Sequence, residues 1–120
     1  MRRIVLVDHG SRRADANAAV EALVAPLAKR IGAPVTVAHM ELAAPLYTDV
    51  LAEVAEIAAL EEIVIVPLFF TPGRHYSEDV EAPTRQLAAR RPDLRVRLLE
   101  PLTLHASFLD FLAAVVADRP

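Results

Sequence analysis

Four short runs of apolar residues mark the chain, and all but the fourth are continuous rather than alternating with polar residues. The runs cover residues 4–7, 35–38, 63–68 and 96–99 and are rich in Val, Ile and Leu. Consecutive apolar residues are typical of strands covered on both faces, as in a parallel sheet. Arg95 and Arg97 flank Val96 in the fourth run, so we expect that strand at an edge of the sheet.

Between and after these runs, apolar residues recur at helical spacing. The expected helices cover residues 14–31, 46–60, 78–91 and 106–117. Gly32 and Pro34 end the first helix, whereas Pro83 fits the third helix only in its first turn. The alternation predicts an α/β fold: one open four-stranded parallel sheet with right-handed crossovers and helices on both faces. We expect the flavodoxin-like strand order 2-1-3-4, in a single domain spanning residues 1–120.

Composition narrows the class of protein. Hydrophobic residues make up 54 % of the 120 residues, which excludes a disordered chain, and no apolar run is long enough to span a bilayer. The net charge of −3 and the aromatic content of 5 % argue against nucleic acid as a partner. The absence of Cys excludes disulfides and thiolate metal sites. Only four apolar residues follow Arg3 before Asp8, too few for a signal peptide, so we expect a cytoplasmic protein.

The histidines suggest where the chemistry takes place. His9 follows the first predicted strand, His39 ends the second, His75 lies in the loop after the third, and His105 follows the fourth. All four therefore fall at the carboxyl edge of the predicted sheet, where ligands bind in open α/β folds. Imidazole binds divalent ions such as Fe²⁺, Co²⁺ and Ni²⁺ and transfers protons near neutral pH. The pattern predicts a site for a metal ion, for proton transfer, or for both.

Each candidate residue also has a structural interpretation. The turn at residues 8–11 either caps the next helix or binds an anion at the N-terminus of that helix. The loop at residues 67–79 is either a turn with Ser77 as the N-cap or part of a site. Glu41 either points into the cleft or is structural. We expect His39 to be a buried, hydrogen-bonded core residue and His105 to start the last helix.

Three sequence blocks together resemble a known family. They are residues 4–12 (Ile-Val-Leu-Val-Asp-His-Gly-Ser-Arg), residues 40–45 (Met-Glu-Leu-Ala-Ala-Pro) and residues 64–79, which contain Pro-Leu-Phe and Gly-Arg-His followed by an Asp four residues later. Their order and spacing resemble the short form of the sirohydrochlorin chelatases, the class II chelatases of sirohaem and cobalamin biosynthesis. Residues 101–105 add a weaker match. The family pattern has Gly and Pro where this chain has Thr103 and Ala106, and an apolar residue at His39.

The resemblance implies an ATP-independent lyase that inserts a divalent ion into sirohydrochlorin. It implies Co²⁺ or Fe²⁺ as the metal substrate, with Ni²⁺ as a further candidate, and no organic cofactor. It assigns metal handling to His9 and His75, and it maps the acidic residue after the second strand to Glu41. Long members of the family carry two such domains with the site between them, so one domain implies a homodimer.

A mechanism follows as a hypothesis. One imidazole accepts a pyrrole proton while the other holds the ion, and Glu41 shares either duty. The carboxylates of the substrate would be bound by Ser11, Arg12, Arg13 and Arg74, and Phe70 and Tyr76, with Leu68 and Phe69, would form walls for the flat macrocycle. A non-catalytic metal or tetrapyrrole carrier is the main alternative. A phosphate- or flavin-binding module ranks last because only Gly10 and Ser11 suggest a phosphate loop.

Overall fold

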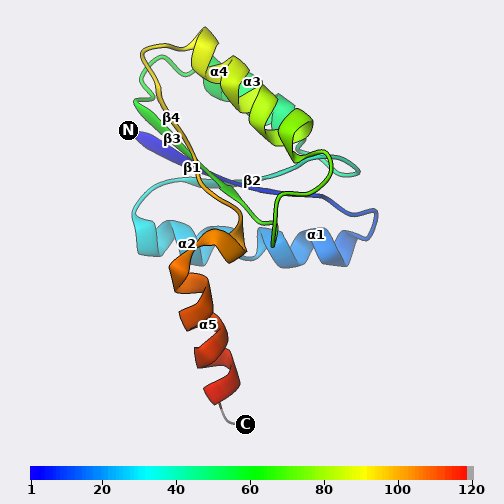
Figure 1. The fold of residues 1–120 in the computed structure, drawn as a ribbon. Coiled ribbons are helices and arrows are strands. Elements are labelled where there is room, and N and C mark those ends of the chain that lie inside the picture. The colour runs from blue at the N-terminus through cyan, green and yellow to red at the C-terminus, as the bar shows by residue number, and fades with distance from the viewer. Residues whose placement is uncertain (119–120) are drawn as a thin grey trace.

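The sheet is the one that the apolar runs predict. The computed structural model describes residues 1–118, and its four strands are all parallel in the order β2-β1-β3-β4 (Figure 1). They are β1 (Arg2–Asp8), β2 (Val35–His39), β3 (Glu62–Pro67) and β4 (Arg95–Leu98). The fold class and the strand order predicted from the sequence are therefore confirmed.

Strand β1 lies inside the sheet and carries the core on both of its faces. Ile4 and Leu6 point to one face, and Val5 and Val7 point to the other, in two separate apolar clusters. All four side chains are at most 3 % exposed. This burial on both sides explains why the run at residues 4–7 has no polar alternation.

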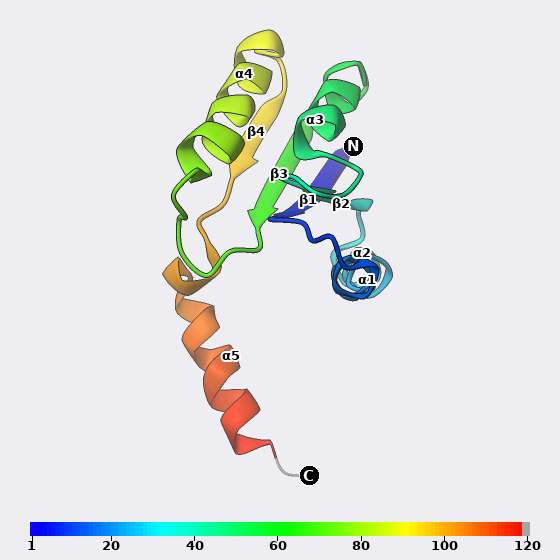
Figure 2. The same ribbon diagram turned by 90° about the vertical axis from the view of Figure 1, so that its right-hand side faces the viewer.

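Two helices cover each face of the sheet. Helices α3 (Tyr47–Ala55) and α4 (Ala82–Arg90) lie on one side, and α1 (Ala14–Glu21) and α2 (Val24–Ile31) lie on the other (Figures 1 and 2). A buried hydrogen bond of 2.7 Å joins the hydroxyls of Tyr47 and Thr84 and so links α3 to α4. The Thr84 hydroxyl also donates to the Val80 carbonyl at 2.6 Å.

The predicted helix at residues 14–31 is wrong in one respect, because it is interrupted at Ala22 and Leu23. The cause is Pro26, which has no N–H for the carbonyl four residues earlier and whose ring clashes with that carbonyl. The chain instead closes a tighter turn, with the Leu23 N–H donating to the Val20 carbonyl at 3.0 Å. Pro26 then falls in the first turn of α2, where its missing N–H costs little.

The predicted helix at residues 78–91 begins earlier than expected. A π-helical turn, η1 (Ser77–Glu81), precedes α4, and Pro83 occupies the first turn of α4 as the sequence requires. One of the two interpretations of this loop made Ser77 an N-cap, but Ser77 lies inside the helical segment and makes no capping hydrogen bond. The Asp79 N–H donates to the His75 carbonyl at 2.8 Å, so the helical segment already begins near His75.

Strand β4 lies at the edge of the sheet, as its charged residues predict. Arg95 and Arg97 both approach the Glu62 carboxylate on β3, at 3.4 and 3.7 Å, so the arginines of this strand neutralise the neighbouring acidic residue. A 3₁₀ turn, η2 (Leu102–Leu104), then leads to α5 (Ala106–Ala117), whose bounds match the prediction. Helix α5 projects away from the rest of the molecule (Figures 1 and 2).

No helix within residues 1–118 is both long and apolar enough to cross a membrane.

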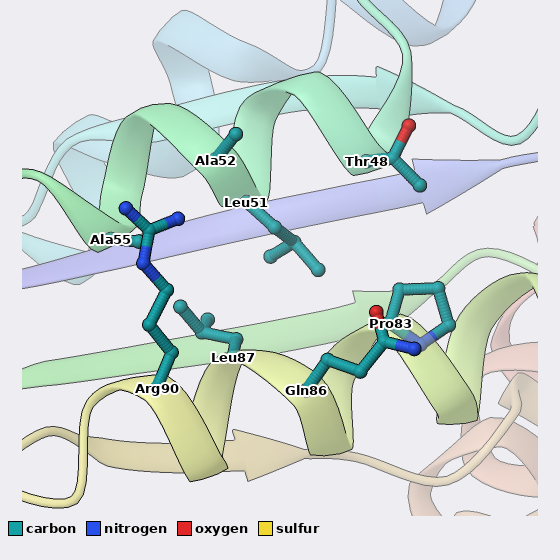
Figure 3. A pocket seen from close by; sticks show the side chains of 8 residues that line it. All are labelled: Thr48, Leu51, Ala52, Ala55, Pro83, Gln86, Leu87 and Arg90. Carbon is teal, nitrogen blue, oxygen red and sulfur yellow. The ribbon is translucent and has the colours of Figure 1, made fainter.

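A cavity of about 210 Å³ lies between α3 and α4, where Leu51 and Leu87 meet and Arg90 lies at one end (Figure 3). None of the four histidines lines this cavity, so it is a gap in the packing of two helices rather than a candidate site.

Candidate active site

The first loop of the site is built around Gly10, between β1 and α1. Gly10 has a φ of +84°, a conformation that residues with a side chain rarely adopt. A Cβ at this position would collide with the backbone oxygen of Glu41 and would lie 3.0 Å from the Cβ of His39. Glycine therefore allows the loop after β1 to lie directly against the loop after β2.

Main-chain hydrogen bonds hold these two loops in register. The Met40 N–H donates to the Asp8 carbonyl at 2.8 Å, and the Glu41 N–H donates to the His9 carbonyl at 3.1 Å. The parallel pairing of β1 with β2 thus continues past the end of β2. As a result, the backbones of His9 and Glu41 lie side by side whatever their side chains do.

A buried polar pair lies beneath this junction. The His39 Nδ1 and the Asp8 Oδ1 are 2.5 Å apart, and His39 is only 3 % exposed. A carboxylate and an imidazole at this separation satisfy each other, which makes the burial of His39 and the partial burial of Asp8 tolerable. His39 is therefore the buried, hydrogen-bonded core histidine that the apolar strand around it predicts, and it joins the carboxyl ends of β1 and β2.

The loop after β3 supplies the remaining part of the site. The ring of Phe69 is buried and lies 4.6 Å, centroid to centroid, from the ring of His9. The edge of Tyr76 packs against Phe69 at 5.9 Å. Burial, reinforced by the carboxylates of Glu81 and Glu100, raises the pKa of Tyr76 to about 12, so its hydroxyl stays protonated at neutral pH.

These three loops enclose a pocket of about 170 Å³. It brings together six residues that the sequence singles out: His9, Glu41, Phe69, Arg74, His75 and Tyr76. Two buried aromatic rings form its apolar part, while the imidazoles, the carboxylates and the guanidinium are exposed. The full lining consists of His9, Met40, Glu41, Phe69, Gly73, Arg74, His75, Tyr76 and Asp79.

Several expected binding residues lie outside this pocket. The Ser11 hydroxyl accepts a hydrogen bond from the Arg13 N–H at 3.0 Å, and the Arg13 side chain pairs with Asp15 at 2.8 Å. Arg12 is exposed on the same loop. Phe70 is 68 % exposed and packs edge-on against Phe108 instead of lining the pocket with Phe69.

The fourth histidine is separate from the other three. His105 precedes α5, and its Nε2 lies 2.5 Å from the Glu100 carbonyl oxygen. It lines a different surface hollow, beside Leu104 and Phe108. The sequence therefore correctly indicates His105 as the start of the last helix.

Two lining residues were not selected as site residues from the sequence. Asp79 follows His75 by four residues at the start of a helical segment, a spacing that places both on one helical face. Met40 stands between His39 and Glu41 and adds polarizable apolar surface. Both residues stand in the blocks that resemble the family, Met40 at the start of residues 40–45 and Asp79 at the end of residues 64–79, although neither was assigned a role.

The chemistry available in the pocket is that of imidazole and carboxylate. Within residues 1–118, no group of three or more His, Asp or Glu side chains is arranged to hold a metal ion. The donors of the pocket stand on three separate loops, with His9 on the first, Glu41 on the second, and His75 and Asp79 on the third. This arrangement suits an ion that enters and leaves, because part of its coordination is left to another molecule.

Two imidazoles and two carboxylates line one pocket at the carboxyl edge of this open parallel α/β domain. The domain therefore belongs to the class of proteins that bind small ligands at that edge of the sheet. The sequence model of the CbiX family matches residues 3–119. The chain therefore belongs to the CbiX family, and the family resemblance seen in the sequence is confirmed.

Individual relatives agree with this assignment. The chain is 35 % identical over 117 residues to the chloroplastic sirohydrochlorin ferrochelatase of Arabidopsis thaliana, covering 97 % of this chain but 50 % of that protein. It thus spans about half the length of this curated relative. The structure of a cobalamin (vitamin B12) biosynthesis CbiX protein from Marinobacter aquaeolei VT8 matches with a TM-score of 0.76 and 31 % identity, covering 97 % of this chain and 94 % of that one.

A longer relative has been solved with a metal. The sirohydrochlorin chelatase SirB from Bacillus subtilis subspecies spizizenii, in complex with cobalt, matches with a TM-score of 0.70 and 25 % identity. The match covers 84 % of this chain and 43 % of SirB. This chain is therefore similar to roughly one half of that protein.

Proposed function

We propose that this chain is a sirohydrochlorin chelatase that inserts a divalent ion, Co²⁺ or Fe²⁺, into the macrocycle in cobalamin or sirohaem biosynthesis. The observation that carries the proposal is that His9, Glu41 and His75 line one pocket although they come from three separate loops. The names of the relatives, a ferrochelatase and a chelatase bound to cobalt, support the same reaction. Ni²⁺ is a further candidate ion, and no organic cofactor takes part.

In the proposed reaction the ion replaces two pyrrole N–H protons, and both protons leave the ring. One of the two imidazoles, His9 or His75, accepts a pyrrole proton while the other binds the ion. The Glu41 carboxylate accepts the second proton, or helps to hold the ion while the second proton passes to water. Tyr76 has a raised pKa, so it acts as a hydrogen-bond donor and not as a base. Arg74 binds a carboxylate of the substrate at the rim.

Ser11, Arg12 and Arg13 are proposed to bind further carboxylates, together with the N-terminus of α1, although they lie outside the pocket. Phe70 is retained as a proposed contact for the macrocycle because its ring is mostly exposed. These proposed contacts lie outside the pocket, which agrees with a substrate larger than the pocket, such as a tetrapyrrole.

The size of the pocket supports a homodimer. A volume of about 170 Å³ accommodates an ion and the reacting part of a ring, but sites that enclose whole organic ligands measure about 300–1,000 Å³. The relatives from Arabidopsis thaliana and Bacillus subtilis are about twice as long as this chain. A second copy would supply the missing half.

The cytoplasmic location expected from the sequence remains a prediction, and the Arabidopsis thaliana relative is named chloroplastic.

Anaerobic absorbance assays with sirohydrochlorin and excess Co²⁺ test the proposal. We expect His9→Ala and His75→Ala to lower the insertion rate at least about tenfold, a lower bound beside the roughly 100- to 10,000-fold that a positioned acid–base group contributes. Both side chains are exposed, so the unfolding transition in urea should not move. His105→Ala is the matched control because it removes an imidazole outside the pocket, and its rate should stay unchanged.

Turnover separates the enzyme from a carrier. A chelatase converts many equivalents of sirohydrochlorin per chain, whereas a carrier stops after binding one. Wild-type rates in both His9→Ala and His75→Ala would rule out the proposed roles, and a stop at one equivalent would rule out catalysis.

A further inference from the structure

Leu42 holds a backbone conformation that leucine rarely adopts. Its φ is +72°, and within residues 1–118 it is the one residue other than glycine with a positive φ. In this left-handed conformation a Cβ crowds the following carbonyl oxygen, so Gly and Asn adopt it far more readily than Leu. The backbone at position 42 therefore disfavours the residue that occupies it.

The loop after β2 holds Leu42 in this conformation from both sides. The Glu41 N–H donates to the His9 carbonyl at 3.1 Å, and the His39 N–H donates to the Pro45 carbonyl at 2.8 Å. The chain thus leaves the sheet at Glu41 and is back beside β2 at Pro45, with three residues between them. Leu42 is the first of these three, and its left-handed backbone is part of this short reversal.

The side chain of Leu42 gains little packing from its own chain in return. It is 51 % exposed, and in the described part of the chain it belongs to neither of the two apolar clusters of the core. Met40, two residues earlier, does pack against one of these clusters. The stability of the domain therefore does not explain a leucine at this position. Backbone strain of this kind is typical of sites that use the side chain so presented.

Leu42 lies beside the pocket and not in it. Its neighbour Glu41 lines the pocket, whereas Leu42 itself does not. Because β1 lies between β2 and β3, the loops that carry Leu42 and Phe70 flank the loop that carries His9. Phe70 is 68 % exposed. Exposed apolar side chains thus occur on both loops that flank the imidazole, an arrangement that suits a flat apolar ligand whose reacting centre lies over the pocket.

We propose that Leu42 packs on the apolar face of the tetrapyrrole, outside the pocket, and contributes to substrate binding and not to the chemical step. This inference rests on the proposed function and adds a substrate-binding residue to it. The pocket of about 170 Å³ encloses only part of such a ring, so the rest of the ring lies on the surrounding surface. The anchored loop presents the leucine in one conformation, so little backbone entropy is lost when the ring binds.

The test is the affinity for metal-free sirohydrochlorin, measured by quenching of the fluorescence of the tetrapyrrole, which needs no turnover. Leu42→Asn should weaken binding about 4- to 12-fold, the effect of covering the half of a leucine side chain that is exposed in the free protein. In the chelation assay, KM for sirohydrochlorin should rise while kcat stays unchanged, because the contact is made equally before and during the chemical step.

Gly32 supplies the matched control because its backbone is also left-handed, with φ +75°, and it lies outside the pocket. No atom lies within 4 Å of the Cβ that a side chain would add there. Gly32→Asn should have a higher urea midpoint than Gly32→Leu, and Leu42→Asn should have a midpoint at or above that of the wild type. The affinity for sirohydrochlorin should differ between Leu and Asn at position 42 and not at position 32.

Three results would overturn this contact. A clear fall in the urea midpoint of Leu42→Asn would show that the side chain packs on its own chain. Unchanged affinity in Leu42→Asn would exclude contact with the ring, and a lower mass in solution than the wild type would assign Leu42 to contact with a second copy.

The same measurements separate this contact from the chelatase proposal. If the wild type inserts metal while Leu42→Asn binds sirohydrochlorin normally, the contact alone is refuted. If Leu42→Asn weakens binding but the wild type shows no turnover, the chelatase proposal is refuted and the contact stands. A wild type that does not bind sirohydrochlorin would refute both.

Discussion

Replacement of Gly10 by Ala tests how the site is positioned. Two costs arise in the folded state. The first is the left-handed backbone at φ +84°, which costs a residue with a Cβ about 1–2 kcal/mol. The second is the collision of the new Cβ with the Glu41 backbone oxygen. Backbone atoms cannot rotate aside as a flexible side chain does, so the two loops must separate, at about 1–3 kcal/mol.

Gly32 provides the control that separates these two costs. It has a φ of +75°, but no atom lies within 4 Å of the Cβ that Ala would add. Gly32→Ala therefore reports the left-handed cost alone. We expect Gly10→Ala to lower the free energy of unfolding, measured in urea, by about 1–3 kcal/mol more than Gly32→Ala.

The chelation rate provides a second readout of the same change. Separation of the two loops shifts Glu41 relative to His9, and a misplacement of about 1 Å can cost roughly 100-fold in rate. Gly32→Ala, at the end of α2 and outside the pocket, should leave the rate unchanged. Equal destabilisation by the two substitutions, or normal chelation by Gly10→Ala, would refute the conclusion that close contact of the loops sets the geometry of the site.

Two further predictions concern buried polar groups. Asp8→Ala should lower the free energy of unfolding by about 3 kcal/mol because it leaves His39 buried without its partner. Adding His39→Leu should restore part of that loss in a double-mutant cycle. Additive losses from the two substitutions would contradict the pairing. Burial raises the pKa of both tyrosines, Tyr47 and Tyr76, the latter to about 12, so tyrosinate absorbance should be missing from the folded protein near pH 10.5 and appear on unfolding. The unfolded chain releases these protons at a lower pH than the folded protein does, so the free energy of unfolding should fall as the pH rises above about 10. A normal tyrosine titration in the folded state would contradict the burial of these hydroxyls.

Much of the fold could be predicted because the determining signal is local. A strand buried on both faces must be apolar throughout, and four such runs alternating with helical spacing leave few possible topologies. The break at Ala22 and Leu23 was also written in the sequence, at Pro26, but the regular apolar spacing of residues 14–31 obscured it. The projection of α5 could not be predicted, because its apolar face indicates a packing partner without saying which chain supplies it.

The imidazoles and the carboxylate that line the pocket could be predicted from the sequence, whereas the positions of the residues around them could be predicted less well. His9, Glu41 and His75 come together because the carboxyl ends of parallel strands share one edge. The positions of Phe69 and Phe70 depend on how the chain turns after β3, and only Phe69 faces the pocket. Ser11 and Arg13 are occupied by local hydrogen bonds that depend on the shape of the turn at Gly10, which residue types alone do not determine.

The main-chain hydrogen bond from Glu41 to His9 has a consequence for the evolution of metal preference. The spacing of these two positions is set by the backbone and by Gly10, so it does not depend on which side chains they carry. Under the proposed function, in which Glu41 helps to hold the ion, a substitution at position 41 from carboxylate to imidazole or amide would exchange a hard donor for a softer or neutral one at constant geometry.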